Sequence, residues 1–200
     1  MRSWKVLLSC LALSCTSAHA ANLLENGDFD SGLTGWTTFT FPASLDSTSG
    51  SPSAPSLQMS TLPFVNSPGG FFEIWSECVS LVGIPQPWEY GMRVRVVNTS
   101  ASCRLYVWAS FDTGTCEAQG TNYGAETFAV GTVPGVGGDF TQYAATTNDP
   151  RPGGGDSRVV RMMALGQCDA ADDAMTVNFD HAYIGTAGTV PVRLQSFGVD

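Results

Sequence analysis

Lysine, histidine and long apolar runs are scarce in this chain of 200 residues. Its one lysine, Lys5, and one of its two histidines, His19, lie within the first 20 residues. The rest of the chain has seven arginines and 18 acidic residues, and seven minus 18 gives a formal charge of −11. Such a surface repels phosphate backbones, so nucleic acid is not an expected partner. The longest apolar runs are too short to span a bilayer, so a membrane span is not expected either.

Patterns for catalysis and for zinc binding are also missing. After residue 20 the chain has a single histidine, His181, and no serine in a nucleophile-elbow sequence. Acidic pairs such as Glu73 and Glu77 are frequent in an acidic chain, and nothing in the sequence distinguishes one pair as catalytic. The chain has no Cys-x-x-Cys pair, which zinc sites commonly contain. The sequence therefore predicts a protein that is neither an enzyme nor a zinc protein.

The first 20 residues have the pattern of a cleaved export signal. Arg2 and Lys5 precede an apolar run over residues 6–13, and residues 18–20 offer the small residues of a cleavage site. A lipoprotein signal ending at Cys15 is a weaker interpretation, because the residues before Cys15 match that pattern poorly. We therefore expect a secreted or periplasmic protein.

Four cysteines follow the predicted signal: Cys78, Cys103, Cys116 and Cys168. In an exported chain they indicate two disulfides, for which three pairings exist. The favoured pairing is Cys103–Cys116, because a strand and a turn between them would bring the two ends together. This leaves Cys78 to pair with Cys168.

Turn-forming residues recur at short intervals along the chain, and a helical period of 3.6 residues is nearly absent. Short strands between turns are typical of an antiparallel β-sandwich, so the predicted fold class is all-β. Residues 42–55 and 146–156 are expected to be loops. The expected strands are residues 71–82, 90–97, 103–111, 126–133, 139–145, 157–165 and 174–184.

Two of the predicted strands, over 90–97 and 103–111, alternate in polarity. Alternate residues point to opposite faces of a strand, so the apolar set of each is expected in the core. The opposite faces carry two aromatic residues and three arginines: Tyr106, Trp108, Arg93, Arg95 and Arg104. We expect these five side chains to share one exposed face of a sheet.

Residues 22–36, NLLENGDFDSGLTGW, resemble the opening of galactose-binding-like jelly rolls, a fold family that includes many bacterial carbohydrate-binding modules. Three later stretches agree with that family in order: SGSPSAPSLQM (49–59), ECVSLVGIPQPWEYGMRVRV (77–96) and VNFDHAYI (177–184). The resemblance implies a jelly-roll β-sandwich over residues 21–186, followed by a separate tail over 187–200.

The resemblance also implies a structural Ca²⁺ between the opening stretch and the closing strand. The corresponding ligands are the Asp28 carbonyl and the carboxylates of Asp30 and Asp180, joined by a carbonyl from the 50–54 loop. Such a mixture of oxygens suits a hard cation. Alternatively, Asp28 and Asp30 only shape a turn. The chain departs from the family at His181, where the family has a second aspartate.

The expected function is binding of a polysaccharide or other glycan by a non-catalytic module. Aromatic rings stack on the apolar faces of sugars, and polar neighbours bind the hydroxyls. Tyr106 and Trp108 have this chemistry beside the arginines, and Trp75 is a further candidate. The alternative is a structural or adhesive protein of the envelope or extracellular space. In that case Tyr106 and Trp108 lie under a loop, and the arginines pair with Glu73 or Glu77.

Overall fold

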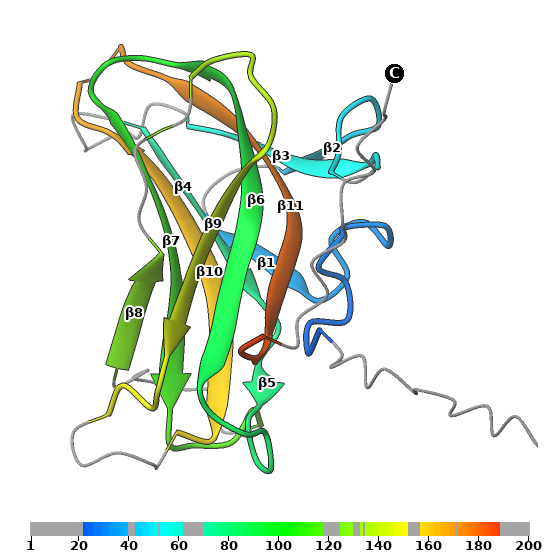
Figure 1. Cartoon of the computed structure of the whole chain (residues 1–200). Coiled ribbons are helices and arrows are strands. Elements are labelled where there is room, and N and C mark those ends of the chain that lie inside the picture. Colours follow the sequence, from blue (N-terminus) through cyan, green and yellow to red (C-terminus); the bar gives the residue numbers. More distant parts are fainter. Residues whose placement is uncertain are drawn as a thin grey trace, which may run out of the picture.

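The structure is a computed structural model that describes residues 22–39, 43–51, 53–61, 70–117, 125–129, 133, 135–151, 157–170 and 172–188. These residues form two antiparallel β-sheets that make the two layers of a sandwich (Figure 1). The predicted all-β sandwich is therefore confirmed. Across this part of the chain no helix is long and apolar enough to cross a membrane. The predicted export signal and residues 189–200 of the predicted tail lie outside the described residues.

The first layer, sheet A, has the strand order β1-β4-β10-β7-β8, and β5 pairs with β10 beside β4. Its strands are β1 (Trp36–Phe39), β4 (Phe71–Ser76), β5 (Val79–Ser80), β7 (Cys103–Asp112), β8 (Ala125–Ala129) and β10 (Val159–Cys168). The second layer, sheet B, has the order β2-β3-β11-β6-β9. Its strands are β2 (Ser44–Asp46), β3 (Ser56–Ser60), β6 (Trp88–Thr99), β9 (Thr141–Thr147) and β11 (Met175–Thr186).

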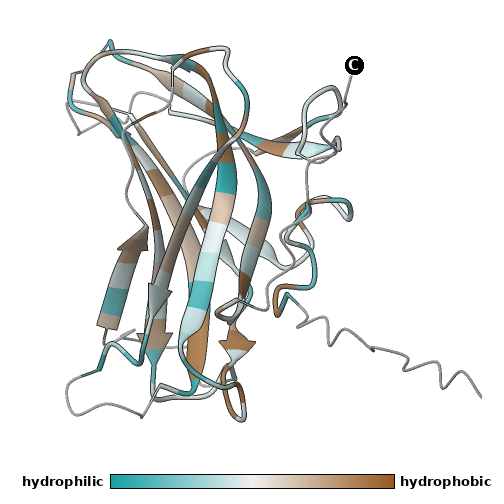
Figure 2. Ribbon diagram, viewed as in Figure 1, coloured by the Kyte–Doolittle hydropathy of each residue, from teal (hydrophilic) through white to brown (hydrophobic). Residues whose placement is uncertain are grey.

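The core lies between the inner faces of the two sheets. Hydrophilic and hydrophobic residues both occur along the strands (Figure 2), because each strand places alternate side chains on its two faces. Phe111 of sheet A stacks on Trp88 of sheet B with ring centroids 5.5 Å apart. Phe72 meets Phe179 edge to face at 5.7 Å. Each fully buried phenylalanine stabilises the fold by roughly 1.5–3 kcal/mol relative to an exposed one, so these pairs hold the layers together.

Three strands near the N-terminus were not predicted. Strand β2 lies inside the stretch 42–55, which was expected to be a loop, so that prediction is wrong for residues 44–46. Strands β1, β2 and β3 have only three to five residues each, which is too short for a clear alternation of polarity. The predicted strand 71–82 is two strands, β4 and β5, and Glu77 between them donates its backbone N–H to the Gly35 carbonyl.

The opening stretch packs against the closing strand β11. The Leu23 N–H donates to the Ile184 carbonyl at 2.9 Å, and the Ala182 N–H donates to the Gly27 carbonyl at 2.8 Å. A β-carbon on Gly27 would lie 2.0 Å from the Ala182 carbonyl oxygen, so only glycine fits at this contact. Trp36 is 9% exposed and belongs to the core.

The two disulfides are Cys78–Cys116 and Cys103–Cys168. The predicted pairing of Cys103 with Cys116, and of Cys78 with Cys168, is therefore wrong. Cys103 begins strand β7 and Cys116 follows its end. A ten-residue strand extends about 33 Å, so these two cysteines lie near its opposite ends. Cys103 instead lies directly opposite Cys168 on the neighbouring strand β10.

Candidate functional site

A row of large side chains crosses the outer face of sheet A. Trp75 on β4 lies opposite Met163 on β10, and Met163 lies opposite Trp108 on β7. Trp108 in turn lies opposite Phe128 on β8. We call these four residues the aromatic row. Neighbouring strands are about 4.8 Å apart, so the row runs across the strands and the two tryptophans lie roughly 10 Å apart.

A second row of side chains runs beside the aromatic row on the same face. Phe39 on β1 lies opposite Glu73, Glu73 opposite Leu165, and Leu165 opposite Tyr106. We call these four residues the mixed row. The ring centroid of Phe39 lies 5.0 Å from that of Trp75, so the two rows are in contact near β1.

The two ends of this face are its most exposed aromatic parts. Phe39 is 41% exposed on β1, and Phe128 is 49% exposed on the edge strand β8. Tyr106 and Trp75 are half-buried between them. Neither Phe39 nor Phe128 was predicted from the sequence as a candidate ligand contact. The sequence did carry a signal for Phe128. It lies two residues after Glu126 in a predicted strand, so both side chains point to the face opposite the core.

Trp108, which was predicted as a ligand-stacking residue, is only 7% exposed. Its indole stacks against the ring of Phe128 at a centroid distance of 6.0 Å. Among the described residues, its Nε1 has no hydrogen-bond acceptor. In this structure Trp108 therefore supports the exposed ring of Phe128, while Tyr106 and Phe128 offer more of their surface to solvent.

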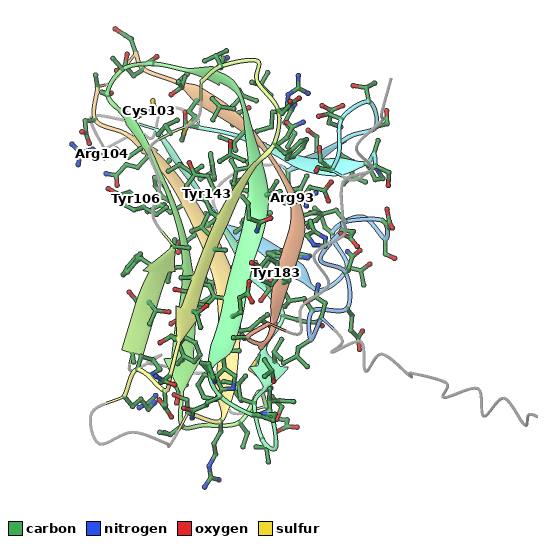
Figure 3. All side chains as sticks on the ribbon, viewed as in Figure 1. Arg93, Cys103, Arg104, Tyr106, Tyr143 and Tyr183 are labelled. Carbon is green, nitrogen blue, oxygen red and sulfur yellow. A yellow bond between two sulfur atoms is a disulfide. The ribbon has the colours of Figure 1, made fainter. Side chains whose placement is uncertain are left out.

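Arg93 and Arg95 do not share this face, so the prediction of five side chains on one sheet face is wrong. Both lie on β6 of sheet B, whereas Arg104 and Tyr106 lie along β7 of sheet A (Figure 3). Alternation of polarity shows which face of a strand is buried, but it does not show to which sheet the strand belongs. Strands β6 and β7 are consecutive in sequence, and the chain changes sheet between them.

Within the part of the chain that the structure describes, the two sheet B arginines bind loop residues and form no ion pair with an acidic side chain. Arg93 donates to Ser51 Oγ at 2.7 Å and to Gln142 Oε1 at 3.2 Å. Arg95 donates to Ser49 Oγ at 2.7 Å and to the Gly138 carbonyl at 3.2 Å. These bonds use both guanidinium groups to fix the 49–51 and 137–138 segments on the outer face of sheet B.

Charged side chains surround the two rows on sheet A. Arg104 forms an exposed ion pair with Asp169 at 3.2 Å. The pKa of Arg104 is raised first by hydrogen bonding to the Tyr106 side chain and then by the Asp169 carboxylate. At the other end of β10, the Arg161 guanidinium lies 5.7 Å from the ring centroid of Trp75, a cation–π arrangement. Both arginines thus contact aromatic side chains of this face.

The predicted calcium ligands lie on a different part of the molecule, where the opening stretch meets β11. The Asp180 side chain is completely buried and accepts backbone N–H bonds from Ser51 and His181. Burial, together with the nearby Asp28 carboxylate, raises the pKa of Asp180 to about 7. Asp28 Oδ1 lies 2.8 Å from Nδ1 of His181, which has the left-handed φ of 46°. The structure therefore gathers Asp28 and Asp180 around His181.

Asp30, the third predicted ligand, is exposed. Within the described ranges there is no group of three or more histidine, cysteine or acidic side chains that could hold a metal ion. The carboxylates of Asp28 and Asp180 face N–H groups and an imidazole, with which a cation would have to compete. The calcium site stays a prediction.

Comparison with known proteins identifies the fold. No protein-family model matches the sequence, and no curated protein matches it either. Among solved structures, it is similar to the C-terminal family 22 carbohydrate-binding module of Clostridium thermocellum Xyn10B. The TM-score is 0.50 at 14% identity, over 86% of this chain and 99% of that module. The chain has the β-sandwich fold of a carbohydrate-binding module. The predicted resemblance is thus confirmed for the fold.

Two further similar structures are longer chains, of which this fold matches only a part. A carbohydrate-binding module from the β-sandwich superfamily, described as having promiscuous specificity, has a TM-score of 0.50 at 13% identity. The match covers 82% of this chain and 62% of that one. An arabinose-bound α-L-arabinofuranosidase has a TM-score of 0.50 at 18% identity, over 85% of this chain. This chain matches only 27% of that enzyme, so the enzyme's activity does not transfer with the fold.

Proposed function

We propose that this protein is a non-catalytic glycan-binding module whose ligand lies on the outer face of sheet A. The observation that carries the proposal is the pair of exposed rings, Phe39 and Phe128, at the two ends of a band of large side chains. Tyr106 and Trp75 lie half-buried between them. Aromatic rings stack on the C–H faces of sugars, and Glu73 and Arg104 provide hydrogen-bonding groups beside them.

The arrangement of carboxylates on this face supports binding rather than hydrolysis. Glu73 lies on β4 and Glu126 on β8, and these strands are separated by β10 and β7. Three strand spacings amount to roughly 14 Å. Glycosidases place their two carboxyl groups about 5 to 10 Å apart. This pair is therefore too widely separated to cleave a glycosidic bond.

The proposal includes export to the periplasm or the medium. Two disulfides suit an oxidising compartment, and the first 20 residues have the pattern of an export signal. A structural Ca²⁺ bound near Asp28 and Asp180 is also part of the proposal. Its support is the resemblance of residues 22–36 and 177–184 to calcium-binding jelly rolls. A bacterial source is proposed on the same resemblance.

A structural or adhesive role is the second candidate function. It is favoured by the burial of the middle of the aromatic row, where Trp108 is 7% and Met163 is 4% exposed. A protein that uses this fold only as a stable unit has no need of an open stacking surface at these positions.

A glycan array with the purified protein distinguishes the two functions. Phe128→Ala and Tyr106→Ala are the test variants, and Leu45→Ala is the control, because Leu45 is 44% exposed on β2 of sheet B. We expect saturable binding that falls at least tenfold in both test variants and is unchanged in the control. A folded native protein that binds no glycan on the array would contradict the proposal and favour the structural role.

A further inference from the structure

We infer that the Cys78–Cys116 disulfide fastens a redox-controlled strap across the outer face of sheet A, which a dithiol reductant opens while the other disulfide stays oxidised. The strap is the segment of residues 113–117, which Cys116 joins to Cys78. Opening it uncovers Trp108, the buried ring of the aromatic row. The effect on ligand binding rests on the proposed function, whereas the selective reduction and the exposure of Trp108 do not.

The strap crosses strand β10 on its outer side. Strand β7 ends at Asp112, and four residues later the Cα atom of Cys116 lies 5.5 Å from that of Cys78. Cys78 precedes strand β5, which pairs with β10 on the side away from β7. Because Val79 lies opposite Val160, Cys78 lies beside the interior of β10 and not beyond its end. The core fills the inner side of β10, so the strap passes over the outer side.

Exposure along β7 falls towards the strap. The side chains that this strand directs to the outer face are exposed at Arg104, half-buried at Tyr106, 7% exposed at Trp108 and 1% exposed at Ser110. Ser110 lies opposite Arg161 on β10, where the strap crosses that strand. Serine is mostly exposed in proteins, so a buried serine on an outer sheet face indicates that another segment covers it. The strap therefore closes one end of the face, next to Trp108.

The two disulfides differ in their access to solvent. Cys103 and Cys168 are 7% and 1% exposed and belong to the core. Cys78 and Cys116 are half-buried. In thiol–disulfide exchange a thiolate must reach a sulfur atom, so the more accessible disulfide is reduced first. The buried disulfide then still joins β7 to β10 while the strap is open.

The reaction that opens the strap is thiol–disulfide exchange with a dithiol. One thiolate of the reductant attacks a sulfur of the Cys78–Cys116 bond, which breaks, and a mixed disulfide forms as one cysteine leaves as a thiolate. The second thiol of the reductant then displaces the other cysteine and closes a disulfide within the reductant. The dithiol loses two electrons and two protons, and Cys78 and Cys116 gain them as two thiols.

Stepwise reduction of the native protein tests the selectivity. The folded protein is titrated with dithiothreitol, alkylated with iodoacetamide and mapped by mass spectrometry. We expect Cys78 and Cys116 to be alkylated at dithiothreitol concentrations roughly tenfold below those that alkylate Cys103 and Cys168. Alkylation of Cys103 and Cys168 first, or of all four cysteines together, overturns the inference.

Acrylamide quenching of tryptophan fluorescence tests whether the strap opens. The oxidised protein is compared with the selectively reduced protein and with Cys78→Ser combined with Cys116→Ser, so the result does not depend on the folding of the variant. We expect a higher quenching constant in both. Trp108→Phe in the same variant is the matched control, in which the rise is expected to disappear. Unchanged quenching on selective reduction overturns the inference.

The glycan array separates this inference from the proposed function. The variant without the Cys78–Cys116 bond is expected to bind the same glycans more tightly than the native protein, because Trp108 adds a stacking surface. Equal binding by the two proteins overturns the control of the site by the strap and leaves a glycan-binding module. A blank array with both proteins overturns the proposed function, and alkylation and quenching then decide the inference by themselves.

Discussion

Asn26 organises the opening stretch through both ends of its side-chain amide. The amide nitrogen donates to the carbonyls of Gly32 and Thr34 at 3.0 and 2.9 Å. The amide oxygen accepts the Ser31 N–H at 3.0 Å. Trp36 Nε1 donates to the Asn26 backbone carbonyl at 2.9 Å. One buried asparagine thus fixes the loop that ends at the core residue Trp36.

Asn26→Ala is expected to lower the free energy of unfolding by about 3 kcal/mol, because three side-chain hydrogen bonds of about 1 kcal/mol each are lost. Chemical denaturation of the variant and of the native protein measures this difference. The control is Asn98→Ala, since Asn98 is exposed at the end of β6. Equal losses in the two variants would contradict the organising role of Asn26.

Asp180 makes stability depend on pH in an uncommon direction. Its pKa is about 7 in the folded protein, because it is buried, and about 3.9 in an unfolded chain. The folded state therefore holds the proton more tightly, and the contribution of Asp180 to stability is lost as pH rises from about 4 to about 7.

Denaturation in EDTA at several pH values measures this dependence. Between pH 4 and 7 the native protein is expected to lose a few kcal/mol relative to Asp180→Asn, whose side chain does not titrate. Parallel curves for the two proteins would show that the Asp180 pKa is the same in both states. EDTA is included because a bound cation would favour the ionised carboxylate.

At the scale of strands, alternation predicted the inner and outer faces well. Met92 and Val94 of β6 are completely buried, and so are Val107 and Ala109 of β7, as the pattern of their strands indicated. Alternation did not predict the sheet to which each strand belongs, so Arg93 was grouped with Tyr106. That assignment depends on packing between residues far apart in sequence, about which the local pattern of one strand carries no information.

The disulfide pairing could not be predicted for a similar reason. It depends on which strand lies beside β7, and that neighbour is β10, whose half-cystine is 65 residues away in sequence. The candidate site could be predicted only in part, because the sequence does not show which strands are neighbours. Tyr106, Trp108, Trp75 and Arg104 do lie on one face, but the exposed rings belong to β1 and β8, and β1 was too short to be recognised.

Removal of the Cys103–Cys168 disulfide is expected to lower the free energy of unfolding by roughly 4 kcal/mol, because a loop of 65 residues is no longer closed in the unfolded chain. Cys103→Ala combined with Cys168→Ala tests this by thermal and chemical denaturation. Peptide mapping without reduction checks the pairing itself. A cross-linked peptide joining Cys103 to Cys116 would contradict the structure.

At the scale of the whole molecule, a bound cation would join the opening stretch to the last strand of sheet B. Binding at the proposed Ca²⁺ site stabilises the folded state by an amount that grows with the logarithm of the calcium concentration, about 2.7 kcal/mol when calcium is at 100 times its Kd. Differential scanning calorimetry in CaCl₂ and in EDTA is expected to show a Tm several degrees higher in calcium.

Two variants assign the calcium effect to the predicted site. Asp180→Asn is expected to abolish the shift in Tm. His181→Asp, which supplies the aspartate found in the related family, is expected to enlarge it, because an oxygen ligand replaces an imidazole that pairs with Asp28. Equal Tm values in CaCl₂ and EDTA for the native protein would contradict the site.

Strand β7 is covalently tied near both of its ends. Cys103, its first residue, is joined to β10, and Cys116, four residues after its last residue Asp112, is joined to Cys78 between β4 and β5. A polymer that pulls on Tyr106 applies tension to the middle of this strand. The tension passes through covalent bonds into two other parts of sheet A. Only the segment between the two cysteines is then free to extend under load, which limits mechanical unravelling of the strand that carries Tyr106.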